Sequence, residues 1–300
     1  MSYFKDLLTD ECFKSGFFLQ GPNPVTDQRK VFSYLDYGGE AIKVNDVLWI
    51  MSQWWTPYDF KDASFSKKSE GVYEYFNQSR RCLINTNEGR FRFVLDSQAE
   101  YKQRLGGPRT DPSAPWSHFL LEQDFVESVR IRDLSALFAN VKVRINDVKS
   151  LDGDSFDPNK HTAQFIWYLT IREGNGKSKE GLGGNFIWFG IPIYDYRYPS
   201  IAKHIQYDGD FAGSTKALIY CLNSKDYLSD APLKFGKEYE ISLDILPAIR
   251  RAVKYAVKNK IFATSRNLVV NYMNIGWELP GSFAVDSEIS NIRLKGVLND

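Results

Sequence analysis

The chain has 300 residues, of which 43% are hydrophobic, so it can bury one large core or two ordinary ones without disulfides or a structural metal. Its 38 Lys and Arg residues balance 37 Asp and Glu residues, and this net charge of +1 excludes a general phosphate-backbone binder. No apolar run reaches the roughly 20 residues of a membrane-spanning helix, so neither nucleic acid nor a membrane is expected as a partner. Aromatic residues make up 15% of the chain, about twice an average share.

The N-terminal segment and the cysteines give little sign of export or of a metal. Residues 1–18 contain several charges and no uninterrupted apolar stretch, so no secretory signal peptide is expected. The expected location is cytoplasmic, or extracellular if a leader has been removed. Cys12, Cys82 and Cys221 are far apart and lack zinc spacing. We therefore expect no disulfide framework, metal or cofactor.

Most of the chain is predicted to form short β-strands separated by turns. The pattern behind this prediction is apolar and polar alternation, as in Val141, Val143 and Ile145, and a hairpin is expected around Asn87-Glu88-Gly89. In chain order the predicted strands are Phe17–Gln20, Val31–Asp36, Val47–Gln53, Val72–Asn77, Arg81–Thr86, Arg90–Leu95, His118–Phe125, Val141–Ile145, Gln164–Ile171, Phe186–Ile193, Ala217–Leu222, Tyr239–Leu243, Leu268–Trp277 and Glu288–Leu298. This profile predicts an all-β sandwich or barrel.

Two segments are predicted to be helical. A short helix is expected over Ser97–Arg104. The segment Asp244–Lys260 is an amphipathic helix, with Asp244 as the expected N-cap and Pro247 in the first turn. Its basic side favours a solvated face over a phosphate or membrane contact, because the whole chain is nearly neutral.

We expect a single domain over residues 1–300. The Gly- and Pro-rich loop Gly106–Pro115 is the best candidate boundary, but the strands on its two sides have the same character. Gly174–Gly184 is predicted to be a flexible hairpin loop. The carboxylates of Asp152–Asp157 could bind calcium, although an Asx-rich turn is favoured because the ligand loop is incomplete.

Some of the aromatic residues gather beside polar groups. In the segment Tyr194–Tyr198, the tyrosines are expected on one side of an extended strand and Asp195 and Arg197 on the other. Rings that cover the C–H face of a pyranose, next to groups that bind its hydroxyls, are typical of a carbohydrate site. The alternative is that these rings fill the sandwich interior. The two sets are Trp54, Trp55 and Tyr58, and Tyr194, Tyr196 and Tyr198. Trp277, next to Glu278, is a further candidate for stacking on the sugar.

Two carboxylates are candidates for acid or base chemistry. Glu122 is predicted to share a strand face with His118, which favours either a tuned acid or a surface ion pair. Glu278 follows a long apolar strand and adjoins Trp277. Partial burial beside an aromatic ring would raise the pKa of Glu278 toward that of a general acid. The alternative is a solvent-facing Glu278 in a turn formed by Pro280 and Gly281.

The C-terminal third resembles glycoside hydrolase family 12, a jelly-roll family of β-glucanases in the concanavalin A-like group. The resemblance covers about Tyr239–Val297, where a strand, an amphipathic helix, a strand ending Gly276-Trp277-Glu278 and a final strand follow one another. It implies a single large jelly roll with Glu278 as the acid/base.

The chain departs from this family at the nucleophile. In the family, a Glu lies four residues before a Trp. Here Ala163 precedes Trp167 by four residues, with Gln164 next to it. Retaining hydrolysis needs two carboxyl groups about 5–5.5 Å apart. The second carboxyl would therefore have to come from Glu122 or Asp195.

Three functions are compatible with these features. The first is a carbohydrate-active protein, glycoside hydrolase-like, that acts on an oligo- or polysaccharide with Glu278 as proton donor. The second is a non-catalytic carbohydrate-binding protein whose rings stack on sugars. The third is an interaction protein whose aromatic residues form a subunit interface. The sequence does not fix the oligomeric state.

Overall fold

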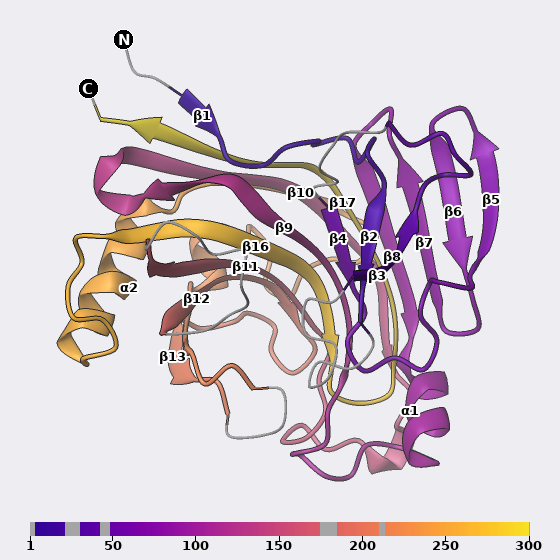
Figure 1. Cartoon of the computed structure of the whole chain (residues 1–300). Helices are drawn as coiled ribbons and strands as arrows, with labels where there is room; N and C mark the ends of the chain where they lie inside the picture. Colours follow the sequence, from indigo (N-terminus) through magenta and orange to yellow (C-terminus); the bar gives the residue numbers. More distant parts are fainter. Residues whose placement is uncertain (1–3, 22–30, 43–48, 175–184, 210–213, 300) are drawn as a thin grey trace.

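The computed structural model describes residues 4–21, 31–42, 49–174, 185–209 and 214–299. The predicted Gly174–Gly184 loop therefore lies almost wholly outside the described residues. Two β-sheets pack face to face over a hydrophobic core, and the N- and C-termini lie near each other at one end (Figure 1). The predicted all-β jelly-roll sandwich is confirmed.

The first sheet, here called sheet A, is eight-stranded within the described residues. Its order is β15-β10-β17-β8-β7-β6-β5, and β1 also pairs with β17. The strand bounds are β1 (Phe4–Asp6), β5 (Ser64–Ser69), β6 (Val72–Phe76), β7 (Arg80–Asn85), β8 (Arg90–Asp96), β10 (Leu134–Ser150), β15 (Glu238–Asp244) and β17 (Phe283–Leu298).

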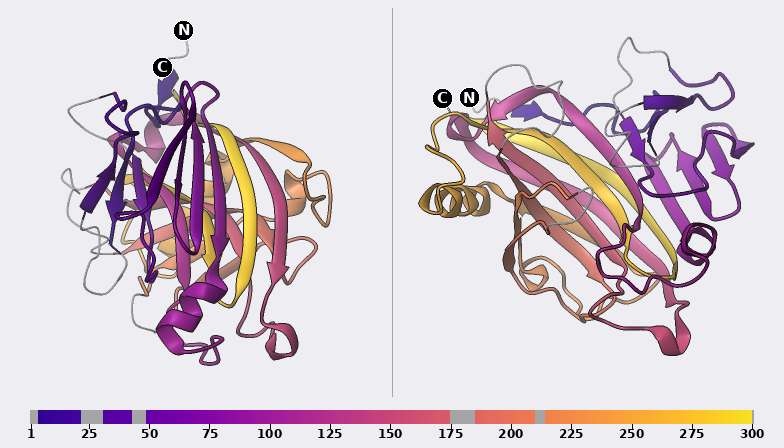
Figure 2. Two further views of the ribbon diagram at one scale, coloured as in Figure 1. Left: turned by 90° about the vertical axis from the view of Figure 1, so that its right-hand side faces the viewer. Right: turned by 60° about the horizontal axis from the view of Figure 1, so that its bottom comes forward.

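The second sheet, sheet B, is nine-stranded over the same described ranges, in the order β13-β14-β12-β11-β16-β9-β4-β2-β3. Its long strands bend, so that the face turned away from sheet A is concave (Figures 1 and 2). The bounds are β2 (Phe17–Gln20), β3 (Val31–Leu35), β4 (Trp49–Ser52), β9 (Ser117–Arg130), β11 (Gln164–Glu173), β12 (Phe186–Asp195), β13 (His204–Tyr207), β14 (Leu218–Cys221) and β16 (Leu268–Leu279).

Both predicted helices are present, at opposite ends of the molecule (Figure 2). Helix α1 (Ser97–Leu105) begins after Asp96, whose side chain accepts the Gln98 N–H. Helix α2 (Leu246–Lys258) buries one apolar face. Asp244 is not its N-cap, since Ile245 holds that position. The Asp244 carboxylate instead accepts the N–H groups of Leu246 and of Leu137 on β10, which ties the start of the helix to sheet A. Three short 3-10 helices, η1 (Ile131–Asp133), η2 (Gly153–Ser155) and η3 (Ser224–Asp226), complete the described elements.

Rings fill the space between the sheets, as the alternative for the aromatic residues expected. Trp277 is fully buried, its indole N–H donates to Ser287 on β17, and its ring contacts Phe165 and Tyr194. Trp277 therefore cannot stack on a substrate, and this part of the site prediction is wrong. Trp277 also lies on the opposite face of β16 from Glu278, so it is not the aromatic neighbour of that carboxyl.

A buried ion pair joins the sheets to helix α1. The Arg80 guanidinium on β7 donates to both carboxylate oxygens of Glu100 on α1, over 2.6 and 3.0 Å. Both side chains are 0% exposed. Thr56 and Ser79 also donate to Glu100, and Arg80 donates to the carbonyl of His118 on β9. The pair thus fixes the start of β9, in sheet B, against sheet A.

We expect Glu100→Ala to destabilise the fold by about 3–5 kcal/mol, because it leaves the Arg80 charge buried without its partner. Urea unfolding measures the change. Lys67→Ala is the control, since it breaks an ion pair with Glu40 whose side chains are 36% and 38% exposed, and such pairs contribute about 0–1 kcal/mol. A loss from Glu100→Ala no larger than the control's would contradict the structural role of the pair.

Candidate functional site

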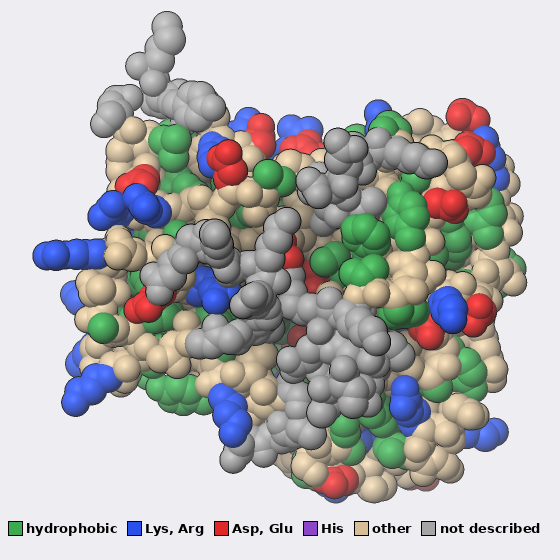
Figure 3. Space-filling view, in the orientation of Figure 1, with side chains coloured by type: hydrophobic (Ala, Val, Ile, Leu, Met, Phe, Trp, Pro, Cys, Tyr) green, Lys and Arg blue, Asp and Glu red, His purple; other side chains and the backbone are tan. Residues whose placement is uncertain are grey.

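The outer faces of the two sheets differ in character. On sheet A, exposed or half-exposed charges pair with one another, as in Arg92 with Asp286 and Arg90 with Glu288. Such a self-neutralised surface is typical of a solvated face. The concave face of sheet B instead carries buried polar and aromatic side chains. In Figure 3, acidic surface is visible near the middle of the view, beside a hydrophobic patch.

Glu278 lies in a row of polar residues that crosses this concave face. Residues directly opposite in neighbouring strands point to the same side of a sheet. Asp195 on β12 pairs with Gln164 on β11, Gln164 pairs with Glu278 on β16, and Glu278 pairs with His118 on β9. Their neighbours in sequence, such as Trp277 and Phe165, point into the core. The row therefore faces away from the core, and the predicted Glu278 is not in a solvent-facing turn.

Gly276 allows β16 and β9 to approach closely beside this row. It has φ +150°, and a Cβ at this position would lie 2.2 Å from the Phe119 carbonyl oxygen. Only glycine fits that backbone and that contact. Gly276 thus fixes the pairing that brings His118 next to Glu278.

Glu278 is enclosed by protein but remains reachable. Its side chain keeps 23% of its surface exposed. The Trp116 indole Nε1–H donates to Glu278 Oε2 over 3.3 Å. Burial raises the pKa of Glu278 to about 7, the Trp116 hydrogen bond lowers it, and the Asp208 charge raises it. At neutral pH the carboxyl is about half protonated.

His118 is a neutral neighbour of Glu278. Its Nε2 lies 3.8 Å from Glu278 Oε2, while its Nδ1 is 2.9 Å from the Trp116 carbonyl oxygen. Burial, with a contribution from the charge of Arg80, lowers the pKa of His118 to about 4. An uncharged imidazole that donates through Nδ1 leaves Nε2 as an acceptor. The contact between His118 and Glu278 is therefore not an ion pair at neutral pH.

Trp116 is the aromatic residue beside Glu278 that the sequence analysis did not select. Its ring stacks on His118, with centroids 5.6 Å apart, and Arg109 lies over it at 5.7 Å. Arg109 is buried and donates to the carbonyls of Pro112, Ala114 and Lys160. Arg109 thus organises the loop that presents Trp116. The feature of the sequence that could have identified Trp116 is its position two residues before His118.

Asp195 is present in the row but is fully engaged. It accepts hydrogen bonds from Thr162, from the Gln164 amide and from both the backbone and the guanidinium of Arg197. These donors outweigh burial and lower the pKa of Asp195. Asp195 is two strands from Glu278, about 10 Å between backbones. Asp195 and Arg197 form a structural anchor for this end of the row.

Glu122 lies on the concave face but away from Glu278. It pairs with Asn274 on β16, four residues from Glu278, which corresponds to roughly 13 Å along the strand. Its residue exposure is 2%. His118, expected to act with Glu122, is separated from it by Leu120 and lies against Glu278 instead. The structure does not bring Glu122 and Glu278 together.

The tyrosines of the predicted 194–198 segment do not form a sugar platform. Tyr194 faces the core, where it contacts Trp277, whereas Tyr196 packs one edge against Phe283 and is 37% exposed. The strand ends at Asp195, and a turn then brings exposed Tyr198 against Arg197 rather than opposite it. These placements correct the predicted alternation.

Of the predicted loop residues, only Trp54 lies next to the row. Its carbonyl accepts the His118 backbone N–H, and its side chain is partly exposed. Trp55 is 9% exposed and packs against Tyr101 and Arg104, so it belongs to the loop's own core. Tyr58 is partly exposed and its backbone N–H donates to Thr56.

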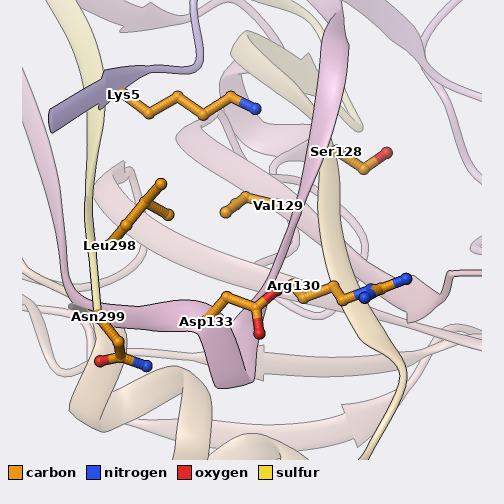
Figure 4. A pocket seen from close by; sticks show the side chains of 7 residues that line it. All are labelled: Lys5, Ser128, Val129, Arg130, Asp133, Leu298 and Asn299. Carbon is orange, nitrogen blue, oxygen red and sulfur yellow. The ribbon is translucent and has the colours of Figure 1, made fainter. Parts of the chain in front are cut away.

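A separate hollow of about 600 Å³ lies away from this row, between β1 and the ends of β9 and β17 (Figure 4). Its charged lining residues are Lys5, Arg130 and Asp133, and none of its seven lining residues is aromatic. No residue predicted for the site lines it. Among the described residues, no group of His, Cys, Asp or Glu is arranged to hold a metal ion, and the Asp152–Asp157 segment contains the short 3-10 helix η2. No described helix is long and apolar enough to cross a membrane.

Comparison with known proteins gives matches among solved structures only. No protein-family model and no curated protein matches the chain. A metagenome-derived glycoside hydrolase family 12 endoglucanase has 10% identity and a TM-score of 0.43, with 79% of this chain and 96% of the other covered. The family 12 xyloglucanase of Bacillus licheniformis has 11% identity and a TM-score of 0.43, with 78% and 99% covered. The likeness concerns the fold, and no residue role follows from it.

We expect Glu278→Gln to gain stability relative to the unmodified protein as pH rises. The folded-state pKa of about 7 lies above the ordinary value of 4.5. The folded state therefore binds this proton more tightly, and its stabilising effect is complete below pH 4.5 and is lost as pH rises through 7. Denaturant unfolding between pH 4.5 and 8 measures the difference. A difference that is constant over this range would contradict the raised pKa.

We expect Trp116→Phe to raise the pKa of Glu278 further, because the indole N–H that stabilises the carboxylate is removed while the ring is kept. Titration of ¹³C-labelled glutamate by NMR measures this pKa. Trp277→Phe is the matched control, since its indole N–H donates to Ser287 on the other face of the same strand. The site geometry would be wrong if both variants shifted the pKa equally.

Proposed function

We propose that the concave face of sheet B binds a polysaccharide and that Glu278 is the proton donor for hydrolysis of a glycosidic bond. The observation that carries the proposal is a single carboxyl that is enclosed, reachable and has a pKa of about 7. A general acid works best when its pKa lies near the operating pH, because it is then protonated yet still a ready donor.

The groups around Glu278 are suited to a sugar. The Trp116 ring stacks on His118, and the carbonyl of partly exposed Trp54 accepts the His118 backbone N–H. Flat rings of this kind cover the C–H face of a pyranose. Further along the same face, Asn274 Oδ1 is a buried acceptor without a partner among the described residues. A bound hydroxyl would satisfy such an acceptor.

In the proposed reaction, protonated Glu278 gives its proton to the glycosidic oxygen as the bond from that oxygen to the anomeric carbon breaks. A water molecule supplies the oxygen of the new bond to the anomeric carbon and releases a proton to solvent, from which Glu278 is protonated again. Trp116 holds the resulting carboxylate through its indole N–H, and neutral His118 adds no charge that would keep the proton from leaving. His118 and Trp116 thus position Glu278, while Glu278 alone exchanges the proton.

A non-catalytic carbohydrate-binding protein is the second candidate. The residue opposite Glu278 on β11 is Gln164, an amide, and its Nε2–H is committed to Asp195. Neither group offers a free carboxylate at the short separation that a covalent glycosyl-enzyme intermediate requires. A protein that only binds sugars needs no such carboxylate.

Glu278→Gln separates the two candidates. If the protein is an enzyme, the variant loses about 100- to 10,000-fold in kcat, while the dissociation constant for the glycan changes little. The panel is barley β-glucan, hydroxyethylcellulose and xyloglucan, with reducing-sugar release for turnover and tryptophan fluorescence for binding.

The control variant is Glu70→Gln, whose side chain is 88% exposed and lies in the turn between β5 and β6 of sheet A. Binding without reducing-sugar release by the unmodified protein identifies a binding protein. If Glu278→Gln hydrolyses the glycan as fast as the control variant, Glu278 is not the proton donor. If the unmodified protein neither binds nor hydrolyses any glycan of the panel, both candidates are refuted.

A further inference from the structure

Arg109 is a buried cation at the edge of the candidate site. Its residue exposure is 2%. Within the described ranges its side chain forms no ion pair with a carboxylate, and its nitrogens donate instead to backbone carbonyls, over 2.9 Å to Ala114 and 2.6 Å to Lys160. Burial lowers the pKa of Arg109, against smaller opposing effects of Tyr101 and Asp111, but a guanidinium stays charged in a protein. A positive charge is therefore held at this place.

Both the backbone and the side chain of Arg109 are fixed. The Nε2 of His161, a residue 3% exposed, lies 2.5 Å from the Arg109 carbonyl oxygen, and its Nδ1 accepts the Asp157 N–H over 3.1 Å. An imidazole nitrogen that accepts an N–H carries no hydrogen, so Nε2 is the donor to Arg109. The carbonyl of Lys160, next to His161, accepts from the guanidinium. Residues 157–161, between β10 and β11, thus hold both ends of Arg109.

The charge of Arg109 acts on the ring of Trp116. Burying a guanidinium without a carboxylate partner costs stability unless other groups offset the charge. Carbonyl dipoles do so here, and so does an aromatic face, because the guanidinium carbon lies 5.7 Å from the centroid of the Trp116 ring. A cation over an indole attracts its π electrons. The indole N–H becomes more positive and a stronger donor, as linked hydrogen bonds strengthen one another.

The hydrogen bond from Trp116 to Glu278 changes in strength when the proton leaves. The indole Nε1–H donates to Glu278 Oε2 over 3.3 Å. Hydrogen bonds to an ionised group are shorter and roughly twice as strong as those between neutral groups. The bond therefore stabilises Glu278 more after proton transfer than before it. Only an interaction of this kind lowers the barrier of the reaction, rather than merely holding the reactant.

We propose that Arg109 is the positioning residue of the proton donor, an inference that rests on the proposed function. Its guanidinium holds the Trp116 ring and strengthens the indole N–H toward the carboxylate that remains on Glu278 when the proton has passed to the glycosidic oxygen. The action of Arg109 passes through Trp116, and Glu278 alone exchanges the proton. A lysine would keep the charge but lose the planar fork that fits several carbonyls and a ring face at once.

The test uses the full-length protein and the pKa of Glu278, followed by NMR of ¹³C-labelled glutamate. Arg109→Lys is expected to raise this pKa by about one pH unit, as for the loss of a hydrogen bond to a charged group. In reducing-sugar assays kcat is expected to fall about 10-fold with KM nearly unchanged. The basic limb of the pH profile moves up by the same amount, because activity requires protonated Glu278. A merely structural loss would lower kcat without moving that limb.

Arg104→Lys is the matched control. The Arg104 guanidinium carbon lies 5.6 Å from the centroid of the Trp55 ring, and its Nη2 donates to the Thr56 carbonyl over 2.8 Å. Arg104 thus makes the same two kinds of contact, but with a tryptophan that does not donate to Glu278. No change in the pKa of Glu278 or in kcat is expected from this variant.

Two measurements separate an action through Trp116 from any other effect of Arg109. Arg109→Lys in the Trp116→Phe protein is expected to add no further shift in the pKa of Glu278, because the two residues act as one unit. In the unmodified protein, the indole ¹H–¹⁵N resonance that Trp116→Phe removes is expected to titrate with the midpoint of Glu278. This second result does not depend on the folding of an Arg109 variant.

The outcomes distinguish this inference from the proposed function. Three results would each overturn the role of Arg109 and leave Glu278 as proton donor: a shift from Arg109→Lys no larger than that of the control, an equal shift with and without Trp116, or an indole resonance that does not titrate. If the shifts occur but the unmodified protein hydrolyses no glycan of the panel, the proposed function is refuted, and the catalytic use of Arg109 with it.

Discussion

The arrangement of the candidate site depends on the buried Arg80–Glu100 ion pair. Two charges removed from water are favourable only when each is neutralised and hydrogen-bonded, and here Thr56, Ser79 and the His118 carbonyl complete the set. Because these groups come from the loop after β4, from sheet A and from β9, forming the pair aligns all three. The His118 end of β9, where it meets Glu278, is therefore set by an interaction on the core side of the sheet.

The Arg80 charge, which helps to organise the fold, also affects the pKa values of the site. The guanidinium of Arg80 holds the carbonyl of His118 and helps to keep its imidazole neutral. A neutral imidazole next to Glu278 does not stabilise the carboxylate, so burial dominates and the pKa of Glu278 rises to about 7. A protonated histidine in that place would have lowered it. The acid character of Glu278 thus follows first from burial, and the Arg80 charge on the other side of β9 contributes by helping to keep His118 neutral.

Sequence periodicity predicted the sandwich and both helices, because each follows from local hydrophobic periodicity. It missed β5 and β13, whose segments Ser64–Ser69 and His204–Tyr207 are polar edge strands with little apolar pattern. It placed Trp277 beside Glu278 because the two are adjacent in the chain, yet adjacent strand residues face opposite sides. The true aromatic neighbour, Trp116, precedes β9, and only the pairing of β9 with β16 brings it to Glu278.

The hydrogen bonds that the Asp195 carboxylate already accepts limit the chemistry that the concave face can support. A nucleophilic carboxylate must leave its hydrogen-bond partners to form a bond, and Asp195 would have to give up the donors from Thr162, Gln164 and Arg197. Breaking the contact of the buried Asp195 carboxylate, 4% exposed, with Arg197 is costly. Asp195 is therefore held in a structural role, and its partners disfavour a covalent intermediate on that carboxylate.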